Sequence, residues 1–336
     1  MNKSIATLFA GAVALTMAHA QDPQAQSQAT DYPAVADAID QTMQAYHYNP
    51  AELTGAPYQA VVAQVAALAA AVENDDAFLE GFREIWKAGP FSHVQLNKAE
   101  QTADALTEYL DNIRIGGGGA VLTWQDDVAV LTINTMMGLD TIEEIDAAYA
   151  AIAEQGASKL IIDLRTNGGG AFAIRPLVNH LTDKAFIAGG FISQPWNAKH
   201  SRAPKLKDMK KVDPWTGWSI RAFWKDAQEN ALTVVQFEPS EPVYDGPVYV
   251  LTSEKTASAA ELATDALKVS ARATIIGEKT AGEMLSQKIY DIPGGFHLSL
   301  PIADYYSAKH GRIEGDGVTP DINAPAADAM DVALSQ

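Results

Sequence analysis

Apolar residues recur every three or four positions between Tyr32 and Asn112, which is the spacing of one buried helix face. The repeats are Val35, Ile39 and Met43; Tyr58, Val62, Val65, Leu68 and Val72; Leu79, Phe82, Ile85 and Trp86; and Leu106, Leu110 and Ile113. This pattern predicts a small helical domain over residues 32–115. Gly89 and Pro90 interrupt it, so Ser92 and His93 are expected on a loop or a short extended segment.

The pattern changes after a run of four glycines, residues 116–119. Short β-branched runs then alternate with helical patterns, a succession that predicts an α/β fold with a largely parallel sheet covered by helices. Expected strands are 120–124, 128–133, 159–164, 248–252 and 273–276, and expected helices are 141–155, capped by Thr141, 172–181 and one from Ala259. The second domain is expected over 116–336, with an insertion at about 185–245 inside a long irregular stretch.

The first 20 residues have the features of an export signal. Lys3 precedes a short apolar run, and Ala18-His19-Ala20 fits a cleavage site. We expect a signal peptide at 1–20 and a disordered, Gln-rich leader at 21–31; a buried N-terminal helix is the alternative. The prediction is an exported protein without a membrane anchor, periplasmic if the source is Gram-negative and secreted otherwise.

Charge and composition narrow the possible partners. Lys and Arg number 24 against 42 Asp and Glu, a formal net charge of -18. Such a balance argues against nucleic acid, whose phosphates require basic surfaces. The chain has no cysteine, so an exported form is held by its core alone. No motif indicates a cofactor or a metal, and the sequence predicts no oligomeric state.

One stretch, residues 248–261, suggests nucleophilic chemistry. A buried strand passes through small residues into a helix, which places Ser258 at a helix N-terminus, where backbone N–H groups face an attacked group. An ordinary serine helix cap is the alternative. The glycines that follow Asn167 fit no phosphate-binding motif; they permit an anion to approach backbone N–H groups, or they form a simple turn.

A serine nucleophile needs a base within hydrogen-bond reach. His93, beside Ser92, is a candidate base, although a structural histidine would give the same local pattern. The other histidines are expected to leave with the signal peptide (His19), on the surface or a helix face (His47, His180, His200), in a strand (His297) or near a turn (His310).

Four stretches in order resemble one family: 160–170, 252–261, 272–282 and 315–321. They are similar to the serine peptidases that include the C-terminal processing (tail-specific) proteases, the tricorn core protease and the modules of interphotoreceptor retinoid-binding protein. The similarity covers about residues 120–322. It implies a ClpP/crotonase-like α/β core with a small N-terminal helical domain, and peptide or protein as substrate.

The family has two catalytic branches. The C-terminal processing branch uses a Ser-Lys dyad, but the lysine position here holds Glu283, and Lys279 and Lys288 are out of register. The PDZ-like segment usual in that branch is also not visible between His93 and Val128.

The tricorn-like branch matches at each position. That resemblance implies Ser258 as nucleophile and His93 as general base, with Ser92 and Glu314 orienting the imidazole. The oxyanion hole would be formed by the N–H groups of Ala259 and of Gly168 or Gly169.

We therefore expect an exported serine peptidase that acts through an acyl-enzyme. A non-catalytic module that binds a ligand or peptide is the alternative from another class, and a Ser-Lys dyad is the alternative mechanism. A basic run, residues 199–211, is expected to be a solvated loop or an attractor of a substrate carboxylate. Four tryptophans of the insertion are expected to form a small core, with one wall of the substrate cleft as an additional role: Trp196, Trp215, Trp218 and Trp224.

Overall fold

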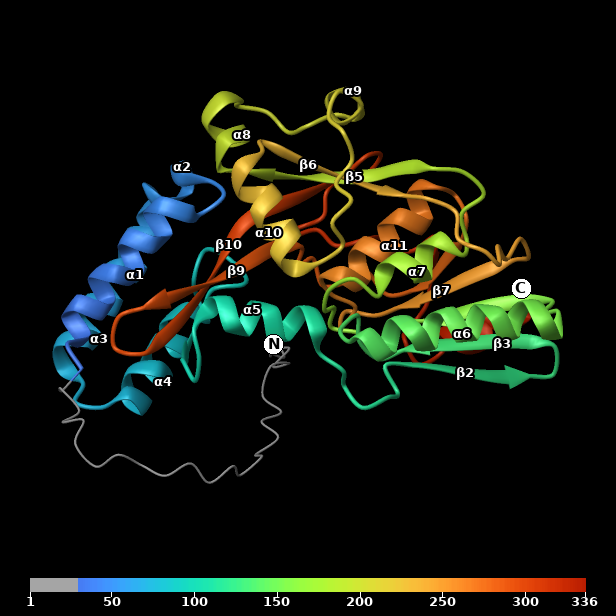
Figure 1. The fold of residues 1–336 in the computed structure, drawn as a ribbon, viewed down its shortest axis with the longest axis horizontal. Coiled ribbons are helices and arrows are strands. Elements are labelled where there is room, and N and C mark those ends of the chain that lie inside the picture. Colours follow the sequence, from blue (N-terminus) through green and yellow to red (C-terminus); the bar gives the residue numbers. More distant parts are fainter. Residues whose placement is uncertain (1–29) are drawn as a thin grey trace.

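The computed structural model describes residues 30–336, so the expected signal peptide and nearly all of the expected leader lie outside the described residues. Within the described range, no helix is long and apolar enough to cross a membrane. The first part of the chain is helical, as its periodicity predicts (Figure 1). Its helices are α1 (Tyr32–Tyr46), α2 (Pro50–Leu53), α3 (Ala56–Ala71), α4 (Asp75–Trp86) and α5 (Ala103–Asn112).

A six-stranded sheet in the order β12-β8-β7-β4-β3-β2 forms the centre of the α/β part. Only β2 is antiparallel to its neighbour, so the expectation of a largely parallel sheet is confirmed here. The strands are β2 (Ala120–Gln125), β3 (Val128–Ile133), β4 (Lys159–Asp163), β7 (Val248–Thr252), β8 (Thr274–Gly277) and β12 (Ile322–Asn323).

Helices cover both faces of this sheet. Leu160 and Ile162 of β4 belong to the main core, whereas Ile161 belongs to a smaller core cluster with α12 (Ala329–Ser335). This alternation is that of a strand buried on both faces. The main core also receives α6 (Leu139–Gln155), α7 (Ile174–Asn179) and α11 (Ala259–Val269).

The structure has a second sheet, which is antiparallel and which the sequence did not reveal. Its path is β1-β10-β5-β6, and β9 and β11 also pair with β10. The α11 helix, nearly all of it buried, contacts β5 and β10 of this sheet. The strands are β1 (Gln95–Lys98), β5 (Phe186–Ser193), β6 (Leu232–Phe237), β9 (Leu285–Ile292), β10 (Phe296–Ser307) and β11 (Gly311–Arg312).

Residues 182–247 were expected to be irregular, and this expectation was wrong. It holds strands β5 and β6, with helices α8 (Gln194–Lys199), α9 (Leu206–Met209) and α10 (Ile220–Glu229) between them. Glycines and short helices hide the strand pattern in the sequence. Trp196 packs in a small cluster of this segment, whereas Trp215 and Trp224 belong to the main core.

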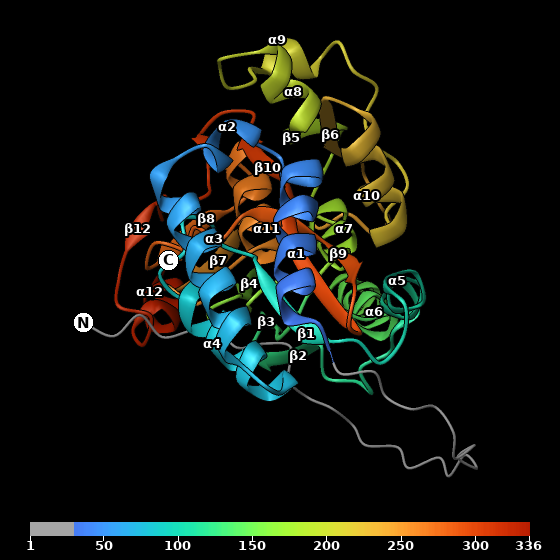
Figure 2. The ribbon, with the colours of Figure 1, turned by 90° about the vertical axis from the view of Figure 1, so that its left-hand side faces the viewer.

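Three local expectations were also wrong. His47 and His180 are buried rather than on the surface. Thr141 is not the cap of α6, because that helix begins at Leu139 after Gly138, whose φ is 100°. The division between residues 115 and 116 stays a prediction, although side chains of α1, α3 and α4 share one continuous core with the sheets. Figure 2 shows α1, α3 and α4 in front of the strands.

Candidate active site

Ser258 lies at the N-terminus of α11, as expected. Strands β4 and β7 are parallel neighbours, so the loops after their carboxyl ends meet at one edge of the sheet. Ser258 is half-buried and has φ 54° and ψ -122°, a conformation that is rare for a residue with a side chain. Such strain persists only where surrounding contacts impose it, and it is common at functional sites.

The glycine loop after β4 packs directly against Ser258. A Cβ on Gly169 would lie 2.6 Å from the Ser258 Cβ, and φ at Gly169 is 99°, so only glycine fits there. Asn167 fixes the loop: its buried side chain donates to the Ile133 carbonyl (3.0 Å) and accepts the Gly169 N–H (2.8 Å). Its carbonyl accepts the Ala257 N–H at 3.1 Å, which ties the loop to the turn before Ser258.

Ser92, His93 and Glu314 form one hydrogen-bonded chain. The Ser92 hydroxyl donates to Glu314 Oε1 at 2.7 Å and lies 2.7 Å from His93 Nδ1. Since that hydroxyl has a single proton, His93 Nδ1 must be the donor to Ser92, and Nε2 is left as the acceptor. Like Ser258, His93 has a positive φ, 61°.

Burial sets the charge of His93. It lowers the pKa of the imidazole below its ordinary 6.5, and the negative charge of Glu314 opposes this effect only in part. His93 is therefore neutral near pH 7, the state in which it can accept a proton.

Strand β10 explains how residues 222 positions apart meet. Strand β1 begins two residues after His93 and pairs with β10, from Gln95 opposite Ser299. Strand β11 ends two residues before Glu314 and pairs with the far end of β10, Arg312 opposite Tyr306. One strand thus positions both partners.

A second carboxylate, Glu261, links this chain to Ser258. Glu261 is fully buried in the first turn of α11, and its Oε2 accepts the N–H of Ser258 (3.0 Å) and of Glu283 (2.9 Å). Its Oε1 accepts the Thr280 hydroxyl and the Gly282 N–H. Burial raises the pKa of Glu261, and these hydrogen bonds oppose the rise.

Glu314 binds the N–H groups of the two residues that follow Glu283. Its Oε2 accepts the N–H of Met284 (2.5 Å) and of Leu285 (3.1 Å). Four consecutive residues, 282–285, therefore bridge the carboxylate that holds Ser258 and the one that orients Ser92. No role was predicted for Glu261, and the stretch 272–282 was a signal of the family but not of the contacts that Thr280 and Gly282 make.

The two lysines of the alternative mechanism have other partners. Lys288 donates to Gln228 on α10, and Lys279 lies 3.8 Å from the carboxylate of Asp316. Between His93 and Val128, where the C-terminal processing branch has a PDZ-like segment, the chain forms β1, α5 and β2.

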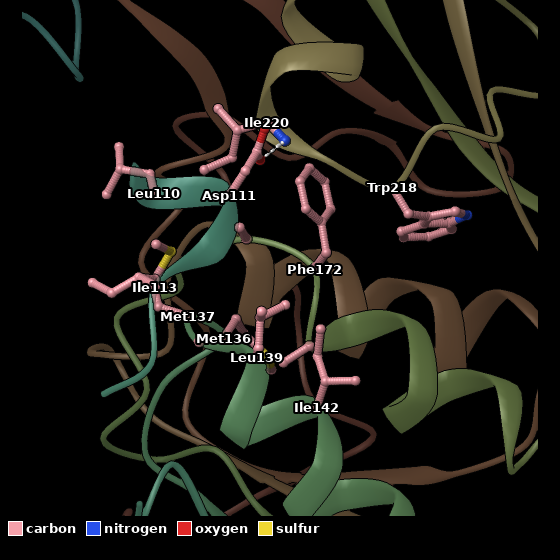
Figure 3. A pocket seen from close by; sticks show the side chains of 13 residues that line it. Leu110, Asp111, Ile113, Met136, Met137, Leu139, Ile142, Phe172, Trp218 and Ile220 are labelled. Atoms are coloured by element: carbon pink, nitrogen blue, oxygen red, sulfur yellow. Dashed lines mark hydrogen bonds between the residues drawn. The ribbon is translucent and has the colours of Figure 1, made fainter. Parts of the chain in front are cut away.

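Two recesses adjoin the site. The first, of about 50 Å³, is apolar; Figure 3 shows Phe172 standing between the end of α5 and Trp218 above Leu139 and Ile142. It lies beside the glycine loop, because Met136 pairs with Gly170 and its N–H donates to the Gly169 carbonyl. Its one charged lining residue, Asp111, accepts the N–H groups of Ile220 and Arg221. Trp218 is thus a wall of a recess, as the sequence suggested for the tryptophans.

The second recess, of about 370 Å³, lies beside the Ser92 loop and Glu314. Its lining includes Phe91, Glu314 and Arg312. Among residues 30–336, no group of three His, Asp or Glu side chains is arranged to hold a metal ion.

Comparisons with known proteins identify the family and the fold. The model of peptidase family S41 matches residues 127–324. A carboxyl-terminal-processing protease from Picosynechococcus sp. is 26% identical over 189 residues, which are 54% of this chain and 36% of that protein. The chain thus spans about a third of the length of the curated relatives it matches.

Two solved structures have the same fold. The photosystem II D1 C-terminal processing protease has a TM-score of 0.54 at 14% identity, covering 88% of this chain and 94% of that one. The tricorn protease has a TM-score of 0.53 at 13% identity, covering 91% of this chain and 35% of that one. The expected α/β class and the expected family resemblance are confirmed.

Proposed function

The chain belongs to peptidase family S41, and on that premise we propose that it is a serine-type peptidase that cleaves peptide bonds through an acyl-enzyme on Ser258. The observation that carries the proposal is the continuous set of contacts from Ser258 through Glu261, residues 282–285 and Glu314 to Ser92 and His93. These contacts connect a serine at a helix N-terminus to a neutral imidazole whose Nδ1 is engaged with Ser92 and whose Nε2 is the acceptor nitrogen.

In this mechanism His93 Nε2 takes the Ser258 proton as the hydroxyl attacks the substrate carbonyl, and later gives it to the leaving amine. Positive charge then develops on the imidazole. Glu314, acting through the Ser92 hydroxyl, stabilises that charge and keeps the Nδ1 proton in place. Water releases the acyl group by the same steps.

The oxyanion would be stabilised by two backbone N–H groups, at roughly 3 kcal/mol each by comparison with single-donor deletions. Ala259, the first residue of α11, supplies one of them. For the other, Gly168 is favoured over Gly169, because the Gly169 N–H already donates to Asn167.

The apolar recess suits the substrate residue whose carbonyl is attacked. It lies beside Gly169 and Gly170, on the loop proposed to bind the oxyanion, and a small apolar side chain would displace water from Phe172 and Leu139. With the export signal expected at 1–20, we propose peptide or protein substrates outside the cytoplasm, and neither nucleic acid nor a membrane anchor as a partner.

Labelling with a fluorophosphonate, which reacts with activated serines, tests the proposal. We expect the wild-type protein to be labelled on Ser258 and to cleave an unstructured protein such as casein. Ser258→Ala and His93→Ala should abolish both, whereas Lys279→Ala and Lys288→Ala should retain both. Circular dichroism would establish that each variant is folded.

The variants also separate the alternatives. Loss of labelling in a folded lysine variant, with His93→Ala still active, would indicate a Ser-Lys dyad. An unlabelled and inactive wild-type protein that still binds peptides would indicate a non-catalytic binding module.

A further inference from the structure

Glu283 occupies an unusual position beside the proposed nucleophile. Its backbone N–H and that of Ser258 donate to the same oxygen of Glu261, so its Cα is held next to the site. Its own side chain is exposed. The next residue, Met284, donates its N–H to Glu314, so the backbone of Glu283 also lies close to that carboxylate.

The nearby Lys and Arg side chains of the described part of the chain are paired with other carboxylates. Within residues 30–336, no Lys or Arg forms an ion pair with Glu261, Glu283 or Glu314. Arg312 lines the recess beside Glu314, but its guanidinium is paired with the buried Asp304 at 2.7 Å. Lys279 faces Asp316.

The proposed mechanism indicates on which side of the cleaved bond Glu283 lies. A general base that returns its proton to the leaving amine must face the leaving segment of the substrate. Glu283 precedes Met284, which donates to the carboxylate that orients Ser92 and His93, whereas the apolar recess lies beside Gly170. A substrate side chain near Glu283 would therefore belong to the residues that follow the cleaved bond.

We propose that Glu283 is a specificity-determining residue that selects substrates with a Lys or Arg side chain just after the cleaved bond. This inference rests on the proposed function, because it places the substrate by the roles of Ser258 and His93. The exposed carboxylate would exchange part of its hydration for a salt bridge with the substrate cation. The cation would also be attracted by the nearby carboxylates, which form no ion pair with Lys or Arg among residues 30–336.

Peptide binding to a Ser258→Ala protein tests the inference without requiring turnover. Fluorescence anisotropy would compare labelled peptides that carry an apolar residue before the bond and Lys, Gln or Glu directly after it. We expect Lys to bind roughly tenfold more tightly than Gln, and Glu more weakly than Gln. Raising NaCl from 50 to 500 mM should reduce the preference for Lys, because salt screens partly exposed charges.

Variants made in the Ser258→Ala background assign the preference to Glu283. Glu283→Gln should bring the Lys-to-Gln ratio close to one, and Glu283→Lys should reverse the order so that Glu binds best. Glu154→Gln removes the same charge from an exposed position on α6 and should keep the wild-type ratio. Thermal unfolding would establish that all variants are folded.

Three results would overturn the inference: equal binding of the Lys and Gln peptides, a Lys preference that survives Glu283→Gln, or a preference seen only for Lys placed before the bond. Failure of the proposed function would appear elsewhere, as a wild-type protein that cleaves none of these peptides and is not labelled by the fluorophosphonate.

Discussion

His47 makes the stability of the protein depend on pH, and the effect can be calculated. The side chain is completely buried at the end of α1, and its ring lies 4.4 Å from that of Phe91, the residue before Ser92. Nδ1 contacts the backbone of Asn49, but Nε2 has no hydrogen-bond partner among the described residues. Burial lowers the pKa of His47 from 6.5 to about 4.

The direction of the effect follows from proton binding. Between pH 6.5 and pH 4 the unfolded chain protonates His47 while the folded protein does not, so acid favours unfolding. One pKa unit is worth about 1.36 kcal/mol, so this histidine should remove about 3 kcal/mol from the free energy of unfolding as the pH falls from 7 to 4. Above pH 7 this histidine should not contribute to the change of the unfolding free energy with pH.

Urea denaturation at intervals between pH 4 and pH 8 would measure this effect. His47→Asn keeps an acceptor for the Asn49 N–H but cannot be protonated. Its absolute stability should fall because a cavity forms, yet the difference from wild type should shrink by about 3 kcal/mol between pH 7 and pH 4. His200→Asn, at an exposed position, controls for the removal of a histidine. Parallel curves for wild type and His47→Asn would refute the reasoning.

Three further predictions concern the site. Glu314→Gln should lower kcat roughly 10²–10⁴-fold with little change in KM. It should also move the acidic limb of the pH–rate profile to lower pH, because Glu314 raises the pKa of His93. Kinetics from pH 5 to 9 would measure both effects, and an unmoved limb with wild-type kcat would exclude this role of Glu314. Asn167→Ala should lower the free energy of unfolding in urea by about 1–3 kcal/mol, because it leaves the Gly169 N–H unpaired. It should also slow labelling of Ser258, and unchanged labelling would show that the glycine loop does not depend on Asn167. Glu261→Gln places an amide NH₂ against two of the four donors that the carboxylate accepts. The free energy of unfolding, measured by urea denaturation, should fall by about 2–4 kcal/mol, and labelling of Ser258 should slow. Wild-type stability would mean that residues 280–283 move to other partners at no cost.

Local patterns in the sequence were enough to predict the elements whose stability is local. The helices α1, α3, α4 and α5 follow from apolar spacing, and the β4 and β7 strands follow from short β-branched runs. Ser258 was found because a strand, a small-residue turn and a helix are contiguous. The His93 and Glu314 roles came only from family resemblance, since no local pattern relates residues so far apart.

The antiparallel sheet could not be predicted in the same way. Strand β5 contains Gly189 and Gly190, which weaken a strand pattern, and the partner of Gly189 is Ser307, more than a hundred residues away. Burial of His47 is similarly non-local, because it depends on Phe91 and on Tyr48, whose N–H donates to the carbonyl of Pro301 in β10.

These non-local contacts have a common origin in β10. It pairs with β1 just after His93, with β11 just before Glu314, and with β9, whose first residue is held by Glu314. At Tyr305 its hydroxyl donates to Asp265, a buried residue two turns along α11 from Ser258. The loop of His93, the segment of Glu314 and the helix that begins at Ser258 are therefore attached to one strand, so a shift in the register of β10 would disturb all three together. For this reason, substitutions in β10 that preserve the fold but move its register should reduce labelling of Ser258 even when every proposed catalytic residue is intact.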